Sequence, residues 1–174
     1  MSRTLKTEAI VLKKKSLLNK DSMVFFFTKE QGKTVVVAKG IRKITSRRSP
    51  HLETGNLITA VFHRKSDRLY LQETKLISGF SELKKDQEKI DILYQFLFVL
   101  ERLLPEHQRE EAVYNLTKLF LVKLSKLEGK KDILTIYFNK LLKLLGYSKQ
   151  NYGLIELESI ISDLINEKLP SFNI

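Results

Sequence analysis

The sequence predicts a β + α protein, with an N-terminal five-stranded barrel of the OB-fold type followed by a C-terminal helical domain. Up to about Ile77, apolar residues occur in short β-branched runs separated by turns. From about Ser81 they recur at helical spacing instead. The net charge is also divided unevenly between these two parts. We therefore expect two domains, a nucleic-acid-binding OB-fold over residues 1–79 and a helical domain over residues 80–174.

Five runs in the first part have the alternation that is typical of strands. Short polar or glycine-containing segments, such as Gln31-Gly32 and Ser66-Asp67, can form the turns between them. Five short strands in roughly 75 residues suit a small closed or nearly closed barrel. The OB-fold is the commonest architecture of this kind, and an SH3-like barrel is compatible with the same pattern. The predicted strands are Thr4–Lys14, Met23–Thr28, Lys33–Lys39, Asn56–Arg64 and Arg68–Lys75.

The second part has the spacing of four amphipathic helices with short links, which is typical of a compact bundle. In the first helix, apolar residues alternate at intervals of three and four up to Leu104, and Pro105 marks its end. Asp132 is a plausible N-cap for the third helix, and Gly146 follows its last turn. The remaining helices are predicted over residues 110–127, 132–145 and 154–169.

The positive charge of the chain is confined to the predicted barrel. Residues 1–79 contain 17 of the 31 Lys and Arg but 6 of the 20 Asp and Glu, so they carry the entire net charge of +11. Basic and acidic residues balance over residues 80–174. A concentrated positive field attracts polyanions and accelerates their encounter with a protein. We therefore expect the barrel to bind nucleic acid.

Basic side chains near the ends of the predicted strands are the candidate contacts. Arg can hold a phosphate through two parallel hydrogen bonds, and Lys acts as a mobile point charge. Tyr70 lies between Leu69 and Leu71, so its ring is expected to face away from the core, where a base could stack on it. At least one of the consecutive residues 25–27, all Phe, must also point outward. The candidate DNA-binding residues are Lys13, Lys14, Lys15, Lys33, Lys39, Arg42, Lys43, Arg47, Arg48, Arg64, Lys65, Arg68 and Tyr70.

The sequence contains no recognisable catalytic or metal-binding motif. It has no Cys, its three His residues are widely separated, and the basic part has no close acidic pair. The glycine-rich loops that bind nucleotide phosphates are also missing. We therefore expect no enzyme activity, no catalytic residue, no metal and no cofactor. No signal peptide or apolar stretch of membrane-spanning length is visible, which predicts a soluble intracellular protein.

Several segments resemble the RecO family of bacterial DNA repair and recombination mediators. Residues 7–15 (TEAIVLKKK), 20–43 and 67–77 (DRLYLQETKLI) are similar to the family's N-terminal domain. Within them, Asp21, Thr28, Gly32 and the tripeptide Ala38-Lys39-Gly40 follow the family's order and spacing. Residues 93–106 and 137–147 resemble helices of the family's second domain.

This resemblance implies an OB-fold followed by a helical domain, binding of single- and double-stranded DNA, and annealing of complementary strands. It also implies RecR and single-stranded-DNA-binding protein as partners, an indirect role in loading RecA, and a location in the bacterial cytoplasm with the nucleoid, without membrane association. Many members carry a four-cysteine zinc site, but residues 146–156 contain no Cys. We therefore expect a short form without zinc.

Two other functions are compatible with the residue pattern alone. The charge distribution would equally suit an RNA-binding OB-fold protein of translation. The chain could also be a non-catalytic interaction module whose basic part docks on an acidic protein.

Overall fold

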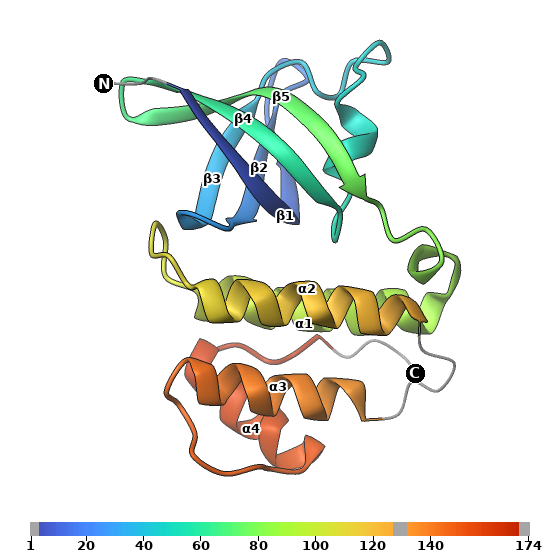
Figure 1. Cartoon of the computed structure of the whole chain (residues 1–174), viewed down its shortest axis with the longest axis vertical. Coiled ribbons are helices and arrows are strands. Elements are labelled where there is room, and N and C mark those ends of the chain that lie inside the picture. The colour runs from blue at the N-terminus through green and yellow to red at the C-terminus, as the bar shows by residue number, and fades with distance from the viewer. Residues whose placement is uncertain (1–3, 127–131, 171–174) are drawn as a thin grey trace. The chain divides into compact units, whose positions relative to one another are not determined.

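The computed structural model describes residues 4–126 and 132–170. The chain divides into two units, and each unit is made of two separate segments of the chain (Figure 1). The barrel unit contains Met1–Gly79 together with Pro105–Glu110, and the helical unit contains Phe80–Leu104 and Glu111–Ile174. A boundary at residues 79 and 80 would place 105–110 with the helices, whereas in the structure this segment belongs to the barrel.

The barrel unit is built from five strands that close on themselves in the order β1-β2-β3-β5-β4 (Figure 1). β1 pairs with both β2 and β4, and β3 and β5 are the parallel pair among otherwise antiparallel neighbours. This closed five-stranded barrel is an OB-fold, so the predicted fold class is confirmed. The strands are β1 (Thr4–Ser16), β2 (Ser22–Thr28), β3 (Gly32–Ala38), β4 (Leu57–Lys65) and β5 (Arg68–Ser78), and a short 3₁₀ helix, Ser49–Leu52, precedes β4.

Alternation along the strands decides which side chains fill the barrel. Phe26 on β2 and Phe62 on β4 are fully buried, and their ring centroids lie 5.4 Å apart. Burial of one such side chain contributes about 1.5–3 kcal/mol relative to exposure. Because successive residues of a strand point to opposite faces, the neighbours of these core residues face outward. The core also contains Ala9, Val11, Val24, Val36, Ala38, Ile41, Leu52, Ile58, Ala60, Leu69 and Leu71.

The segment 105–110 completes the barrel unit at the start of β3. Lys33 and Glu106 form a parallel β-bridge, and the backbone N–H of His107 donates to the Lys33 carbonyl over 2.9 Å. Gly32 has a φ of +69°, and a Cβ atom there would lie 1.8 Å from the carbonyl oxygen of Gln108. Only glycine combines this backbone conformation with so close an approach.

The helical unit contains the four predicted helices, α1 (Gln87–Leu103), α2 (Glu111–Lys126), α3 (Ile133–Leu144) and α4 (Leu154–Ile165), with a 3₁₀ turn at Leu83–Lys85. Its centre is aromatic, with Phe96 stacked on Phe120 at 4.0 Å and on Phe138 at 5.9 Å between ring centroids. Among the described residues, no helix is both long and apolar enough to cross a membrane.

The ends of α3 test two predictions about capping. Asp132 occupies the N-cap position, but its φ is 75° and its side chain makes no capping hydrogen bond. Asp132 is therefore the N-cap residue, as predicted, but its carboxylate does not cap the helix. Gly146 has a φ of +79°, and the following N–H, that of Tyr147, donates to the Leu142 carbonyl over 2.8 Å. This is the glycine-terminated helix end expected from the sequence.

Candidate nucleic-acid interface

Two loops of the barrel unit are tied together by hydrogen bonds. These are the β1–β2 loop, residues 17–21, and the β3 loop, residues 39–48. The Gly40 N–H donates to Asp21 Oδ1 over 2.7 Å, and the Arg42 N–H donates to the Lys20 carbonyl over 3.0 Å. The Arg42 guanidinium also donates to the carbonyls of Asp21 and Leu17. The conformation of the β3 loop is therefore set by the loop before β2.

Arg48 fixes the other end of the β3 loop. Its Nη1 donates to the Leu71 carbonyl over 2.7 Å, and its Nη2 donates to the Lys39 carbonyl over 2.8 Å. One guanidinium thus joins the end of β3 to the middle of β5. Arg42 and Arg48, both predicted as phosphate ligands, use part of their five N–H donors on backbone carbonyls. We assign these two side chains to holding the loop, a role that isolated sequence positions do not reveal.

Other predicted cations are exposed near the same loops. Lys39, Lys43 and Arg47 are exposed in the β3 loop, and Lys14 and Lys15 are exposed at the end of β1. Strand register brings these segments together, because β2 starts between the end of β1 and the end of β3. The sequence could not show this proximity, since about 25 residues separate the two basic clusters along the chain.

The β4–β5 hairpin supplies the remaining predicted cations and the predicted aromatic residue. Lys65 and Arg68 face each other at the turn, and Arg64 precedes them; all three are exposed. Two residues further along β5, Tyr70 lies opposite Val37 of β3 and opposite His63 of β4. Tyr70 is half-buried between the core residues that flank it, so it faces outward as expected from its alternation.

Phe25 is a second outward aromatic residue, and it was not among the named site residues. It lies opposite Lys13 on β1 and Val35 on β3, and its neighbour in sequence, Phe26, is in the core. The Lys13 Nζ is 4.5 Å from the centroid of its ring, and the Lys15 Nζ is 5.8 Å from it. The run of three Phe residues predicted an outward ring. Alternation puts both Phe25 and Phe27 on the face opposite Phe26, and the complete burial of Phe27 identifies Phe25 as the accessible one.

Lys33 does not lie with the exposed cations. It is 9% exposed, and it is paired through its backbone with the segment 105–110 at the opposite end of β3 from Lys39. Lys33 is thus less accessible to a phosphate than the exposed cations, and its part in DNA binding stays a prediction. The structure therefore brings the cations at the end of β1 close to those that follow β3, whereas Arg64, Lys65 and Arg68 lie at the β4–β5 turn and Lys33 lies at the start of β3.

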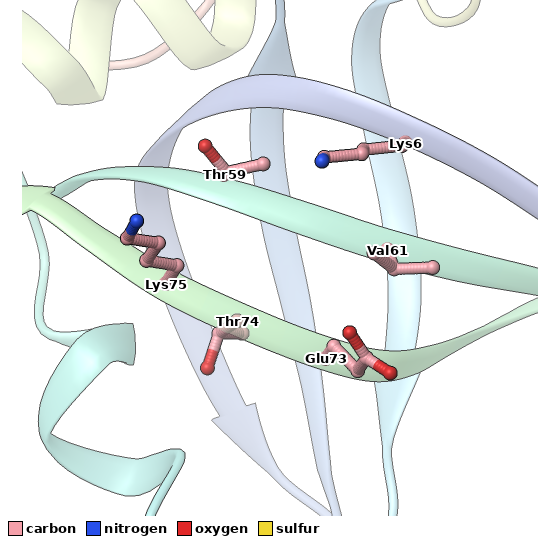
Figure 2. Close-up of a pocket in the computed structure, with 6 residues that line it drawn as sticks. All are labelled: Lys6, Thr59, Val61, Glu73, Thr74 and Lys75. Atoms are coloured by element: carbon pink, nitrogen blue, oxygen red, sulfur yellow. The ribbon is translucent and has the colours of Figure 1, made fainter.

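A pocket of about 340 Å³ lies on the outer surface of β1, β4 and β5 (Figure 2). Its charged lining is mixed, with Lys6 and Lys75 beside Glu73. None of the thirteen predicted DNA-binding residues lines it. The remaining lining residues are Thr59, Val61 and Thr74, and Thr74 Oγ1 is hydrogen-bonded to His51 Nδ1 at 2.8 Å.

Across residues 4–126 and 132–170, His, Asp and Glu side chains nowhere group in threes as metal ligands would.

Comparison with known proteins agrees with the resemblance seen in the motifs. Residues 1–80 match the family described as "Recombination protein O N terminal". The chain is 33% identical over 146 residues to the DNA repair protein RecO of Caldanaerobacter subterraneus subsp. tengcongensis, covering 83% of this chain and 59% of that relative. It is 32% identical over 149 residues to the DNA repair protein RecO of Thermoanaerobacter sp. (strain X514), covering 85% of this chain and 60% of that protein.

A more distant relative extends the match into the last helices. The DNA repair protein RecO of Roseiflexus sp. (strain RS-1) is 25% identical over 170 residues, which are 97% of this chain and 59% of that relative. The chain thus spans about three fifths of the length of the relatives it matches. The similarity covers both the barrel and the helices, in the order found here. Residues 1–80 are thus a RecO N-terminal domain, and the similarity of the chain to RecO proteins continues through the helices.

Proposed function

We propose that this chain is a non-catalytic DNA-binding protein of DNA repair and recombination, which anneals complementary strands and helps to load recombinase on single-stranded DNA. The observation that carries the proposal is the set of exposed Lys and Arg side chains at the end of β1 and in the β3 loop, which the strand register places close together. Four such cations lie in the β3 loop alone, at positions 39, 42, 43 and 47. Hydrogen bonds from Arg42 and Arg48 hold the β3 loop in place. The loop therefore loses less conformational entropy when it binds a phosphate backbone.

Annealing requires that two polyanions approach each other closely. A cationic surface screens their repulsion and releases counterions, without hydrolysis of a nucleotide. The relatives named DNA repair protein RecO support a role in repair. We assign DNA binding to the barrel unit, whereas RecR and single-stranded-DNA-binding protein are the partners proposed for the helical unit. Action on chromosomal DNA would locate the protein with the nucleoid in the bacterial cytoplasm.

The test compares binding of one sequence as single-stranded DNA, as duplex DNA and as RNA, with annealing of complementary strands followed in the same samples. We expect binding to both DNA forms, and annealing that proceeds in chelator and requires neither magnesium nor ATP. A strict requirement for ATP, or cleavage of a strand, would reject the proposal in favour of an enzyme. Preference for RNA over both DNA forms would favour the translation alternative.

A pair of matched variants locates the surface. Lys43→Ala/Arg47→Ala removes two positive charges from the β3 loop, and Lys6→Ala/Lys75→Ala removes two from the rim of the pocket in Figure 2. We expect the first variant to bind single-stranded DNA several-fold more weakly, with a log–log salt slope shallower by about 1.4, and the second to resemble the parent. Equal losses would mean that net charge alone, rather than this loop, determines binding.

A further inference from the structure

An apolar strip crosses the outward face of three strands in the barrel unit. Strand register aligns Phe25 with Val35, Met23 with Val37, and Val37 with Tyr70, so the strip runs from β2 over β3 to β5. All five side chains are half-buried, between the barrel core beneath and solvent outside. The two rings stand on strands separated by two inter-strand spacings, or roughly 10 Å.

Each ring of the strip is covered by a lysine ammonium. Lys13 and Lys15 lie over Phe25 at 4.5 and 5.8 Å, and the Lys39 Nζ lies 4.9 Å from the centroid of Tyr70. An exposed ammonium stabilises an aromatic face weakly, and a stacked nucleobase stabilises it more. A base can therefore replace the ammonium on the ring, and the displaced lysine remains within reach of that nucleotide's phosphate.

We propose that Phe25 and Tyr70 are stacking positions for unpaired DNA bases, and that Lys13, Lys15 and Lys39 move from the rings to the phosphates when the strand binds. This inference rests on the proposed function and adds selectivity to it. In a duplex, both faces of each base are covered by neighbours about 3.4 Å away, so a ring has no base face to contact. The strip therefore favours single strands, whereas the β3 loop attracts both DNA forms.

The first test is Phe25→Leu, which keeps an apolar side chain but removes the ring. We expect affinity for an unstructured single strand to fall about five- to thirty-fold and affinity for a blunt duplex to change less than twofold. The salt slope should stay near the parent's, because no phosphate ligand is removed. Tyr70→Leu should behave in the same way. Equal losses on both DNA forms, or no loss on either while the parent binds DNA, would overturn the proposal.

A second measurement is independent of any loss of stability. The chain contains no Trp, so Phe25→Trp introduces a single fluorescent reporter that can itself stack. The matched control is Phe98→Trp in the helical unit, where the Arg102 guanidinium carbon lies 3.5 Å from the ring centroid. We expect single-stranded DNA to quench the emission of Trp at position 25 but not at position 98, and duplex DNA to quench neither. Binding of a single strand without quenching at position 25 would refute stacking while leaving DNA binding intact. Failure of the parent to bind any DNA would refute the proposed function itself.

Discussion

Gly32 and Gly146 share a backbone conformation but not an environment. Their φ angles are +69° and +79°. A Cβ on Gly32 would collide with the backbone of Gln108, whereas a Cβ on Gly146 would have no neighbour within 4 Å. Gly32 is required both by its positive φ and by the lack of room for a Cβ atom, whereas Gly146 is required by its positive φ alone. Substitution at these two positions therefore separates the two requirements.

We predict that Gly146→Ala lowers the free energy of unfolding by about 1 kcal/mol, the cost of holding an L-residue in the left-handed region. Gly32→Ala should cost more than about 2–3 kcal/mol, because the 105–110 segment must also move away from β3. Urea denaturation followed by circular dichroism measures both values. If the two variants lose the same stability, Gln108 does not crowd Gly32.

At single positions, the sequence predicted which residues are charged and exposed better than it predicted what their side chains contact. Tyr70 faces outward as its alternation predicted, and the exposure of Lys43 agrees with its place in a polar loop. The hydrogen bonds of Arg48 to carbonyls of β3 and β5 could not be predicted, because they depend on strands far apart in sequence. The burial of Lys33 likewise depends on residues more than 70 positions later.

Among the elements, the two tied loops determine the shape of the candidate interface. The Asp21 carboxylate accepts the Gly40 N–H over 2.7 Å, exactly where the chain leaves β3 with a left-handed residue. A carboxylate acceptor strengthens such a bond relative to a neutral one. The family-like pairing of Asp21 with the Ala38-Lys39-Gly40 tripeptide thus has a physical explanation in this contact.

Asp21→Ala should therefore destabilise the barrel unit by about 1–2 kcal/mol and weaken binding of single-stranded DNA several-fold. Asp67→Ala, at the exposed turn of the β4–β5 hairpin, is the control, because it removes the same negative charge. Charge alone would strengthen DNA binding in both variants. Weaker binding by Asp21→Ala together with unchanged or stronger binding by Asp67→Ala would identify loop geometry as the cause, and parallel behaviour would contradict it. Filter binding and thermal unfolding measure the two effects.

Elements with a strong local signal were predicted closely. The alternating strands and the amphipathic helices occur where the apolar spacing indicated, within a few residues at each end. Asp132 had the right residue type and position for a cap, but its backbone is left-handed. The attachment of 105–110 to β3 could not be predicted, because the residue that it requires, Gly32, also fits an ordinary turn, and the β-bridge and hydrogen bond require no particular side chain.

For the whole molecule, the uneven charge is the property with the largest measurable effect. The entire net charge of +11 falls within residues 1–79, and exposed cations supply most of it. We predict that the affinity for single-stranded DNA falls with salt with a log–log slope of roughly −3 to −5, as expected for about five phosphate contacts. Titrations at several salt concentrations measure this slope. An almost flat dependence would contradict a phosphate-dominated interface.

The discontinuous barrel unit also has a consequence for how the protein is made. Residues 80–104 leave the ribosome before the segment 105–110, which delays that segment by about 1–5 s at ordinary elongation rates. During this interval all five strands exist, but the Lys33 carbonyl still lacks the N–H of His107. An unpaired strand edge is a site at which nascent chains associate wrongly. Chains arrested before residue 105 should therefore depend on chaperones more than chains arrested after residue 110.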